Sequence, residues 1–151
     1  MPKPTEEYIA NQSVRYLLIK LGDALGYKEF DKKKHEKEWD KIVRYFKGRC
    51  CYCGEKNGLE LDHIIGLNKI ELGFDCIGNV APAYKNCNQK KNKTKNTNGY
   101  AWELHIKNVC ENTILTERKK RIEEYMRSNK YPPKSYKNII KYREEIDNNY
   151  Q

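Results

Sequence analysis

Apolar residues recur at helical spacing in the N-terminal third of the chain, which predicts two helices there. Thr5 is suited to cap the first helix, because two glutamates follow it where a first turn is expected. Its apolar stripe consists of Val14, Leu17, Leu18 and Leu21. Gly22 and Gly26 should interrupt this pattern. A second helix is predicted from Asp31 to about Phe46, with the apolar stripe Trp39, Ile42, Val43 and Phe46.

The C-terminal third shows the same spacing after Gly99. One predicted helix carries Trp102, Ile106 and Val109, and a second runs from about Thr113 to Asn129 with Leu115, Ile122, Tyr125 and Met126. Pro132 and Pro133 should stop this helix. A tail from about Lys134 carries Ile139, Tyr142 and Ile146 at helical spacing, so it is expected to pack on the body or on a second subunit.

The middle of the chain has a different pattern, with two short apolar runs separated by a polar loop. Residues 59–65 and 79–83 are predicted as strands, with Gly66 ending the first and Pro82 placed at an edge or end of the second. Residues 84–95 are predicted as a helix. The chain is therefore expected to be α+β, with an N-terminal helical region at 1–48, a core at 49–98 and a C-terminal helical region at 99–151, forming one compact domain overall.

Charge and hydropathy narrow the class of partner. The formal net charge is +9 and the mean hydropathy is −1.01, which favours a polyanion, nucleic acid before membrane. No apolar run approaches about 18 residues, so no membrane span is expected. No secretory signal is visible at the N-terminus, so we expect a cytoplasmic protein, where cysteines bind metal more often than they form disulfides.

Five of the six cysteines lie between residues 49 and 95. The spacing Cys50-x-x-Cys53, followed by Gly54, allows two thiolates from one tight turn to bind a tetrahedral Zn²⁺. Cys87 is the third candidate, but Tyr84 stands where a second pair would need a cysteine. Two alternatives follow: one structural Zn²⁺ takes its fourth ligand from Cys51, Cys76, His105 or Cys110, or no zinc binds. Cys110 lies on an apolar helix face and is expected in the core.

The pair Asp62-His63 falls at the end of the first predicted strand, with Asn79 and Asn88 downstream. Carboxylate and amide oxygens such as those of Asp62 and Asn88 suit Mg²⁺ or Mn²⁺ better than Zn²⁺. An imidazole beside them can take a proton from water near neutral pH. Glu60 and Asp75 are further candidate metal contacts, against the alternatives of an outward strand position and a turn residue.

These motifs, in this order, resemble the HNH endonucleases of the ββα-metal fold. The resemblance rests on C-x-x-C-G, L-x-L-D-H-I-I, G-x-D-x-I-x-N-V-x-P and C-N-x-x-K, and covers roughly residues 49–95. It implies that His63 activates the attacking water, that Asp62 and Asn88 hold one divalent metal, and that Asn79 fixes the loop and helps orient the base. It also implies products with 5′-phosphate and 3′-hydroxyl ends. The departure at Tyr84 affects only the zinc site.

The function expected on this basis is metal-dependent cleavage of double-stranded DNA by a type II restriction-like enzyme, with a homodimer favoured for cutting both strands. The alternatives are a phage or mobile-element nicking or homing endonuclease, and a non-catalytic zinc-stabilised nucleic-acid-binding module. The expected phosphate contacts, which could also be a solubilising lysine run, are Lys85, Lys90, Lys91, Lys93 and Lys95. The basic cluster Arg118–Arg121 is either a further DNA contact or an exposed helix face.

Overall fold

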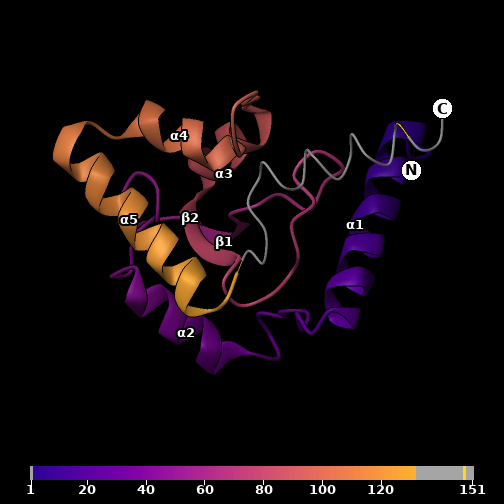
Figure 1. The fold of residues 1–151 in the computed structure, drawn as a ribbon, viewed down its shortest axis with the longest axis horizontal. Helices are drawn as coiled ribbons and strands as arrows, with labels where there is room; N and C mark the ends of the chain where they lie inside the picture. The colour runs from indigo at the N-terminus through magenta and orange to yellow at the C-terminus, as the bar shows by residue number, and fades with distance from the viewer. Residues whose placement is uncertain (1, 132–147, 149–151) are drawn as a thin grey trace.

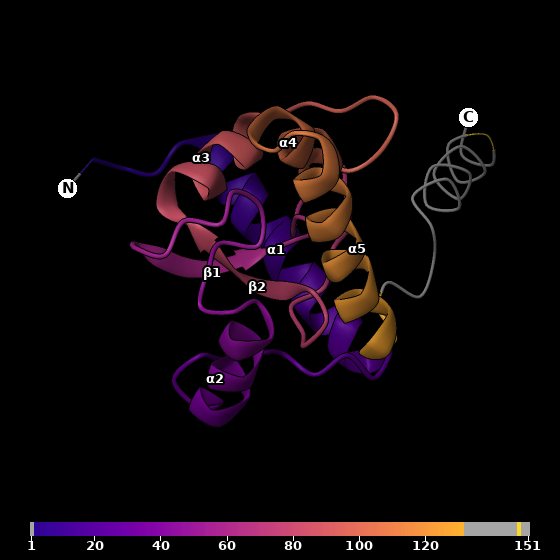
Figure 2. The ribbon, with the colours of Figure 1, turned by 90° about the vertical axis from the view of Figure 1, so that its left-hand side faces the viewer.

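The computed structural model describes residues 2–131 and residue 148. Its described elements follow in the order α1 (Glu6–Ala24), α2 (Glu36–Tyr45), β1 (Leu59–His63), β2 (Val80–Tyr84), α3 (Lys85–Lys93), α4 (Ala101–Val109) and α5 (Asn112–Ser128). The hairpin of β1 and β2 lies in the middle, between α3 on one side and α2 on the other (Figure 1, Figure 2). The predicted α+β class, with a ββα core and flanking helices, is confirmed.

Helix α1 begins where the sequence predicted, because the Thr5 side chain accepts a hydrogen bond from the backbone N–H of Tyr8. The predicted stripe is wrong in part. Leu18 is buried, but Leu17 and Leu21 are 63% and 51% exposed. The inward face is set by Gly22, which lies inside the helix and whose missing side chain lets Phe74 of the β1–β2 loop approach closely.

Helix α2 begins at Glu36 with His35 at its N-cap, four residues later than Asp31, the predicted cap. The Asp31 carboxylate does accept the backbone N–H groups of Lys33 and Lys34, but it stabilises a separate turn ahead of the helix. Asp31 therefore does form capping hydrogen bonds, but the element that it caps is a turn. Trp39 and Ile42, on the apolar side of α2, are buried.

Strands β1 and β2 pair antiparallel, with Asp62 opposite Ala81 and His63 opposite Val80. β1 ends at His63, and the next two residues, predicted as strand, are buried loop. Pro82 lies inside β2, where its carbonyl accepts the backbone N–H of Cys51. This bond attaches the cysteine turn at residues 50–54, called the knuckle below, to the sheet.

Helices α4 and α5 close the core over the sheet. Trp102 and Ile106 of α4 and Ile122 and Met126 of α5 are buried, and Cys110 between the helices is buried as predicted. Tyr125 fixes α5 to the hairpin, since its hydroxyl donates to the carbonyl of Val80 and accepts from the N–H of Gly78.

Asn129 is the C-cap of α5, as predicted. The prolines expected to stop α5 and the predicted tail helix lie outside the described residues. Among the described helices, none is both long and apolar enough to cross a membrane.

Candidate nuclease site

Side chains alternate along β1, so its polar residues point to the two opposite sides of the strand. Glu60 and Asp62 share one side and His63 lies on the other, because successive strand residues point in opposite directions. Helix α3 packs against both strands. Asn88 and Lys91, three positions apart on α3, share the helix face that meets Glu60 and Asp62.

Asp62 is 4% exposed, and its carboxylate has two close partners. Its Oδ2 atom accepts a hydrogen bond of 2.7 Å from the Tyr52 hydroxyl and lies 3.0 Å from the Lys91 ammonium. Lys91 is 2% exposed and also donates to the backbone carbonyl of His63. The buried charge of Asp62 is therefore balanced by Lys91, a residue that the sequence analysis predicted to contact DNA phosphates.

Asn88 lies beside Glu60 rather than in direct contact with Asp62. Its Nδ2 group donates to Glu60 Oε1 at 3.1 Å, and its Oδ1 atom accepts from Asn92. Two neighbouring polar pairs thus form between strand and helix, Asp62 with Lys91 and Asn88 with Glu60.

The oxygen atoms of Glu60, Asp62 and Asn88 are hard donors on facing elements, and a cation bound by Asp62 would have to displace the Lys91 ammonium from that carboxylate. This donor chemistry fits a divalent cation such as Mg²⁺ or Mn²⁺.

His63 contacts the loop between the strands instead of α3. Its Nε2 atom lies 2.8 Å from Asp75 Oδ1, and the side chain is 13% exposed. In the neutral ring, an Nε2–H that donates to the carboxylate leaves Nδ1 as the acceptor. Asp75 was predicted as a candidate metal contact. The structure pairs it with the histidine, twelve residues away, which no local motif could indicate.

Asn79 anchors the loop that carries Asp75. Its Oδ1 atom accepts from the N–H of Ile65 at 2.7 Å, and its Nδ2 group donates to the carbonyls of Ile65 and Phe74 at 2.9 and 2.7 Å. Asn79 is fully buried, so its amide group is well placed to hold both ends of this loop. The hydrogen bonds of its side chain are with the backbone of this loop.

The thiols of Cys50, Cys53 and Cys87 meet between the knuckle and the first turn of α3, with their sulfur atoms within 4.8 Å of one another. Hydrogen bonds from the thiols of Cys51 and Cys87 hold the pKa of Cys50 well below its usual value. Three sulfur atoms at this separation can supply the thiolate donors that zinc prefers.

The other residues considered as a fourth zinc ligand are not part of this group within the described structure. The Cys110 thiol donates to the carbonyl of Tyr52 and accepts from Arg118. Burial raises the pKa of Cys76 to about 12. His105 is buried and its ring packs edge-on against Tyr52. Tyr84, at the position where the second pair lacks a cysteine, precedes α3 as its N-cap.

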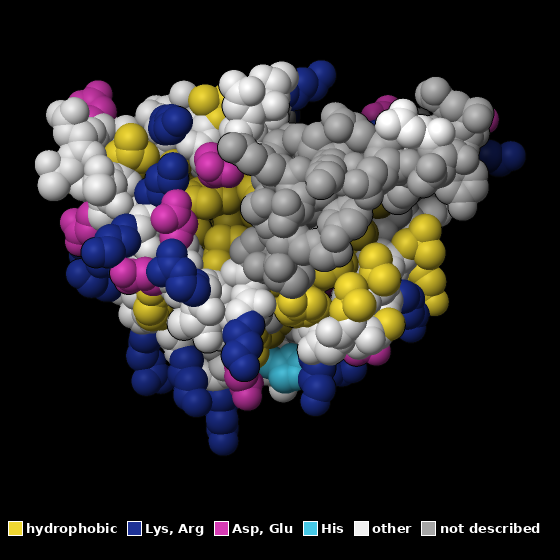
Figure 3. Space-filling view, in the orientation of Figure 1, with side chains coloured by type: hydrophobic (Ala, Val, Ile, Leu, Met, Phe, Trp, Pro, Cys, Tyr) yellow, Lys and Arg dark blue, Asp and Glu magenta, His cyan; other side chains and the backbone are white. Residues whose placement is uncertain are grey.

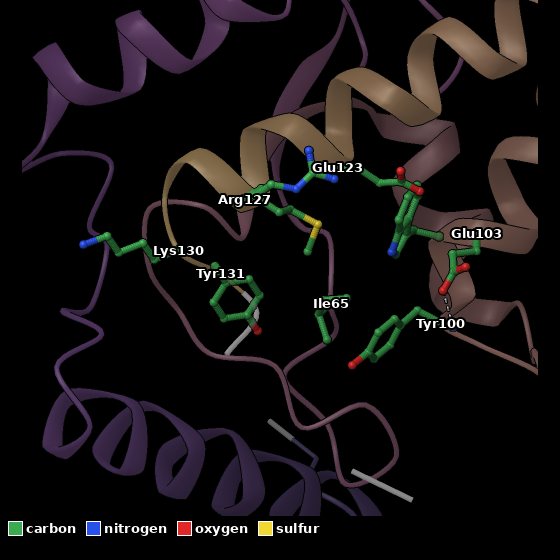
Figure 4. A pocket seen from close by; sticks show the side chains of 9 residues that line it. Ile65, Tyr100, Glu103, Glu123, Arg127, Lys130 and Tyr131 are labelled. Atoms are coloured by element: carbon green, nitrogen blue, oxygen red, sulfur yellow. Dashed lines mark hydrogen bonds between the residues drawn. The ribbon is translucent and has the colours of Figure 1, made fainter. Parts of the chain in front are cut away.

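Three of the predicted phosphate contacts are exposed on α3, namely Lys85, Lys90 and Lys93. A hollow of about 460 Å³ lies between the C-terminal part of α3 and the loop at residues 68–71, and Lys93 and Lys95 line it together with asparagines. A second hollow of about 420 Å³ lies between α4 and α5, with the rings of Tyr100 and Tyr131 on its wall (Figure 4). The predicted site residues do not line this second hollow.

Comparison with known proteins agrees with this geometry. Residues 50–94 match the model of a protein family described as HNH endonuclease. The matched segment contains the knuckle, the hairpin and α3, and thus the cysteine group, Asp62, His63, Asn79 and Asn88. A search of curated proteins found no match to the chain.

Proposed function

We propose that this protein, in which residues 50–94 match the HNH endonuclease family, is a metal-dependent DNA endonuclease of the type II restriction-like kind. The observation that carries the proposal is the 2.8 Å contact between His63 and Asp75 at the end of a strand whose other side bears Glu60 and Asp62. A proton acceptor and hard oxygen donors therefore lie at neighbouring positions of one short strand, and these are the two kinds of group that metal-dependent phosphodiester hydrolysis uses.

His63 is proposed to take the proton from the attacking water through Nδ1. Asp75 fixes the ring orientation through Nε2 and stabilises the imidazolium that forms. Asn79 holds the loop that presents Asp75. As the water oxygen bonds to phosphorus, the bond from phosphorus to the 3′ oxygen breaks and that oxygen takes a proton from solvent water, so the products carry 5′-phosphate and 3′-hydroxyl ends.

Asp62 and Asn88, with Glu60 beside them, are proposed to hold one Mg²⁺ or Mn²⁺. The cation, when bound, supplies positive charge against the phosphate oxygens in the transition state. The exposed lysines Lys85, Lys90 and Lys93 bind flanking phosphates and so position the DNA without reading its sequence. The cysteine group is proposed to bind one structural Zn²⁺.

The direct test is His63→Ala assayed on supercoiled plasmid with Mg²⁺ or Mn²⁺. Loss of the proton acceptor should lower the cleavage rate by about 10²-fold or more, while DNA binding without divalent cation stays close to that of the wild type. Discrete fragments from the wild type indicate restriction, and a nicked circle indicates a nickase. Sealing of the products by a DNA ligase checks the predicted ends.

His35→Ala is the matched control, because His35 is a half-buried histidine at the N-terminus of α2, outside the matched segment. It should cut DNA at a rate near that of the wild type. Near-normal cleavage by the His63 variant would exclude this histidine as the base. A wild type that binds DNA tightly and never cuts it would favour the non-catalytic binding module instead.

A further inference from the structure

Helix α1 carries large apolar side chains on the side that faces away from the body. Tyr8, Ile9, Tyr16 and Leu17 are between 52% and 63% exposed. Within the described part of the chain, α1 packs on no other helix or strand, and on its buried side Gly22 meets Phe74 of the β1–β2 loop. Figure 3 shows a hydrophobic area on the side of the molecule where α1 lies in Figure 1.

The four apolar residues border a shallow, open hollow along the helix. Gln12 and Ser13 also line it, between Tyr8 and Ile9 on one side and Tyr16 and Leu17 on the other. These six residues are called the outer face of α1. A short side chain flanked by long ones is the shape that receives a side chain from a facing helix.

The charge of α1 argues against nucleic acid on this face. The helix carries three acidic residues, Glu6, Glu7 and Asp23, and two basic ones, Arg15 and Lys20, although the whole chain has a net charge of +9. A nearly neutral helix does not attract a polyanion, and it lets two otherwise positive molecules approach each other.

We propose that the outer face of α1 is a homodimer interface, in which two copies of α1 pack against each other about a two-fold axis. In such an interface Leu17 of each copy enters the hollow over Ser13 of the other, so one patch serves as both knob and hole. The four apolar side chains together expose on the order of 500 Å², so two copies bury about 1,000 Å² or more, at the small end of specific interfaces. The dimer is therefore concentration-dependent.

The test measures the mass of the full chain by light scattering and sedimentation from roughly 1 to 100 μM, the range in which a small interface dissociates. The wild type should shift from 18.0 kDa towards twice that mass as its concentration rises. Leu17→Glu should remain at the monomer mass throughout. Because Leu17 is 63% exposed, the variant should keep the helical circular dichroism and thermal midpoint of the monomer.

Leu25→Glu is the matched control, since Leu25 is a leucine of similar exposure at the end of the same helix but outside the outer face. It should dimerise as the wild type does. A wild type that stays monomeric over this range would overturn the proposal, as would a dimer that survives Leu17→Glu or is lost equally in both variants. The assay needs no DNA and no activity, so its result is independent of the proposed nuclease function.

Discussion

At the scale of single residues, the site is organised by a buried ion pair. Asp62 and Lys91 are 4% and 2% exposed, and both charges would be costly to bury alone. The pair is acceptable because the Tyr52 hydroxyl donates a further hydrogen bond to the carboxylate and the ammonium donates one to the carbonyl of His63. Lys91 therefore connects the metal-ligand candidate to the backbone of the proposed base.

We predict that Lys91→Met destabilises the protein by about 3–5 kcal/mol, because it leaves the carboxylate of Asp62 buried without its counter-charge. The free energy of unfolding in urea measures this effect. The double variant Asp62→Asn with Lys91→Met should recover much of the loss, since both charges are then removed. Lys93→Met, an exposed lysine on the same helix, is the control and should change stability by no more than about 0.5 kcal/mol. A loss as small as this for Lys91→Met would contradict the prediction.

At the scale of elements, the knuckle connects the sheet, α3 and α5. The N–H of Cys51 bonds to Pro82 in β2, Cys87 lies in the first turn of α3, and Arg118 of α5 donates to the carbonyl of Tyr52. A zinc ion bound by Cys50, Cys53 and Cys87 would therefore join the hairpin to the helix that carries Asn88.

We predict that the purified protein contains no more than one zinc per chain, and that a strong chelator lowers its thermal midpoint by on the order of 10 °C. Elemental analysis and thermal unfolding provide the two measurements. Cys87→Ser should lose the zinc and most of the response to the chelator. Cys76→Ala, a buried cysteine outside the group, should retain both. Two zinc ions per chain, or a chelator response unaffected by Cys87→Ser, would show that the cysteines have another role.

At the scale of the whole molecule, the burial of His105 makes the stability of the fold depend on pH. Its side chain is 2% exposed, and its Nε2 atom has no hydrogen-bond partner among the described residues. Burial lowers the pKa of His105 below the usual value of 6.5. The unfolded chain thus binds a proton near pH 6.5 that the folded chain does not. The contribution of His105 to stability is complete above that pH and is lost as the pH falls below it.

We predict that the free energy of unfolding falls by up to about 1.4 kcal/mol per pH unit below pH 6.5 because of His105. His105→Gln, which carries no charge at any of these pH values, should show a shallower fall between pH 6.5 and 5. Urea unfolding of both proteins at several pH values gives the difference, and other acidic groups cancel from the comparison. Parallel curves for the two proteins would exclude His105 as the cause.

The helices and the hairpin were predictable where a local signal fixes them. Thr5 caps α1 and Asn129 ends α5 because capping depends on a few neighbouring backbone groups. The start of α2 was wrong because Asp31 caps a turn by the same local chemistry, and sequence alone does not tell a turn from a first helical turn. The outward direction of Leu17 was missed because it depends on Phe74, which meets α1 from a distant loop.

The sequence by itself determined the α+β architecture, the resemblance to HNH endonucleases and the residue types of the site, because these follow from spacing within single elements. Only the tertiary structure decided which of these residues meet. It pairs His63 with Asp75, Asp62 with Lys91, and Asn88 with Glu60, across 12 to 29 positions of the chain. Which residues pair depends on the free-energy cost of closing the loop between them and of burying their charges. Neither cost can be inferred from the order of residues along the chain.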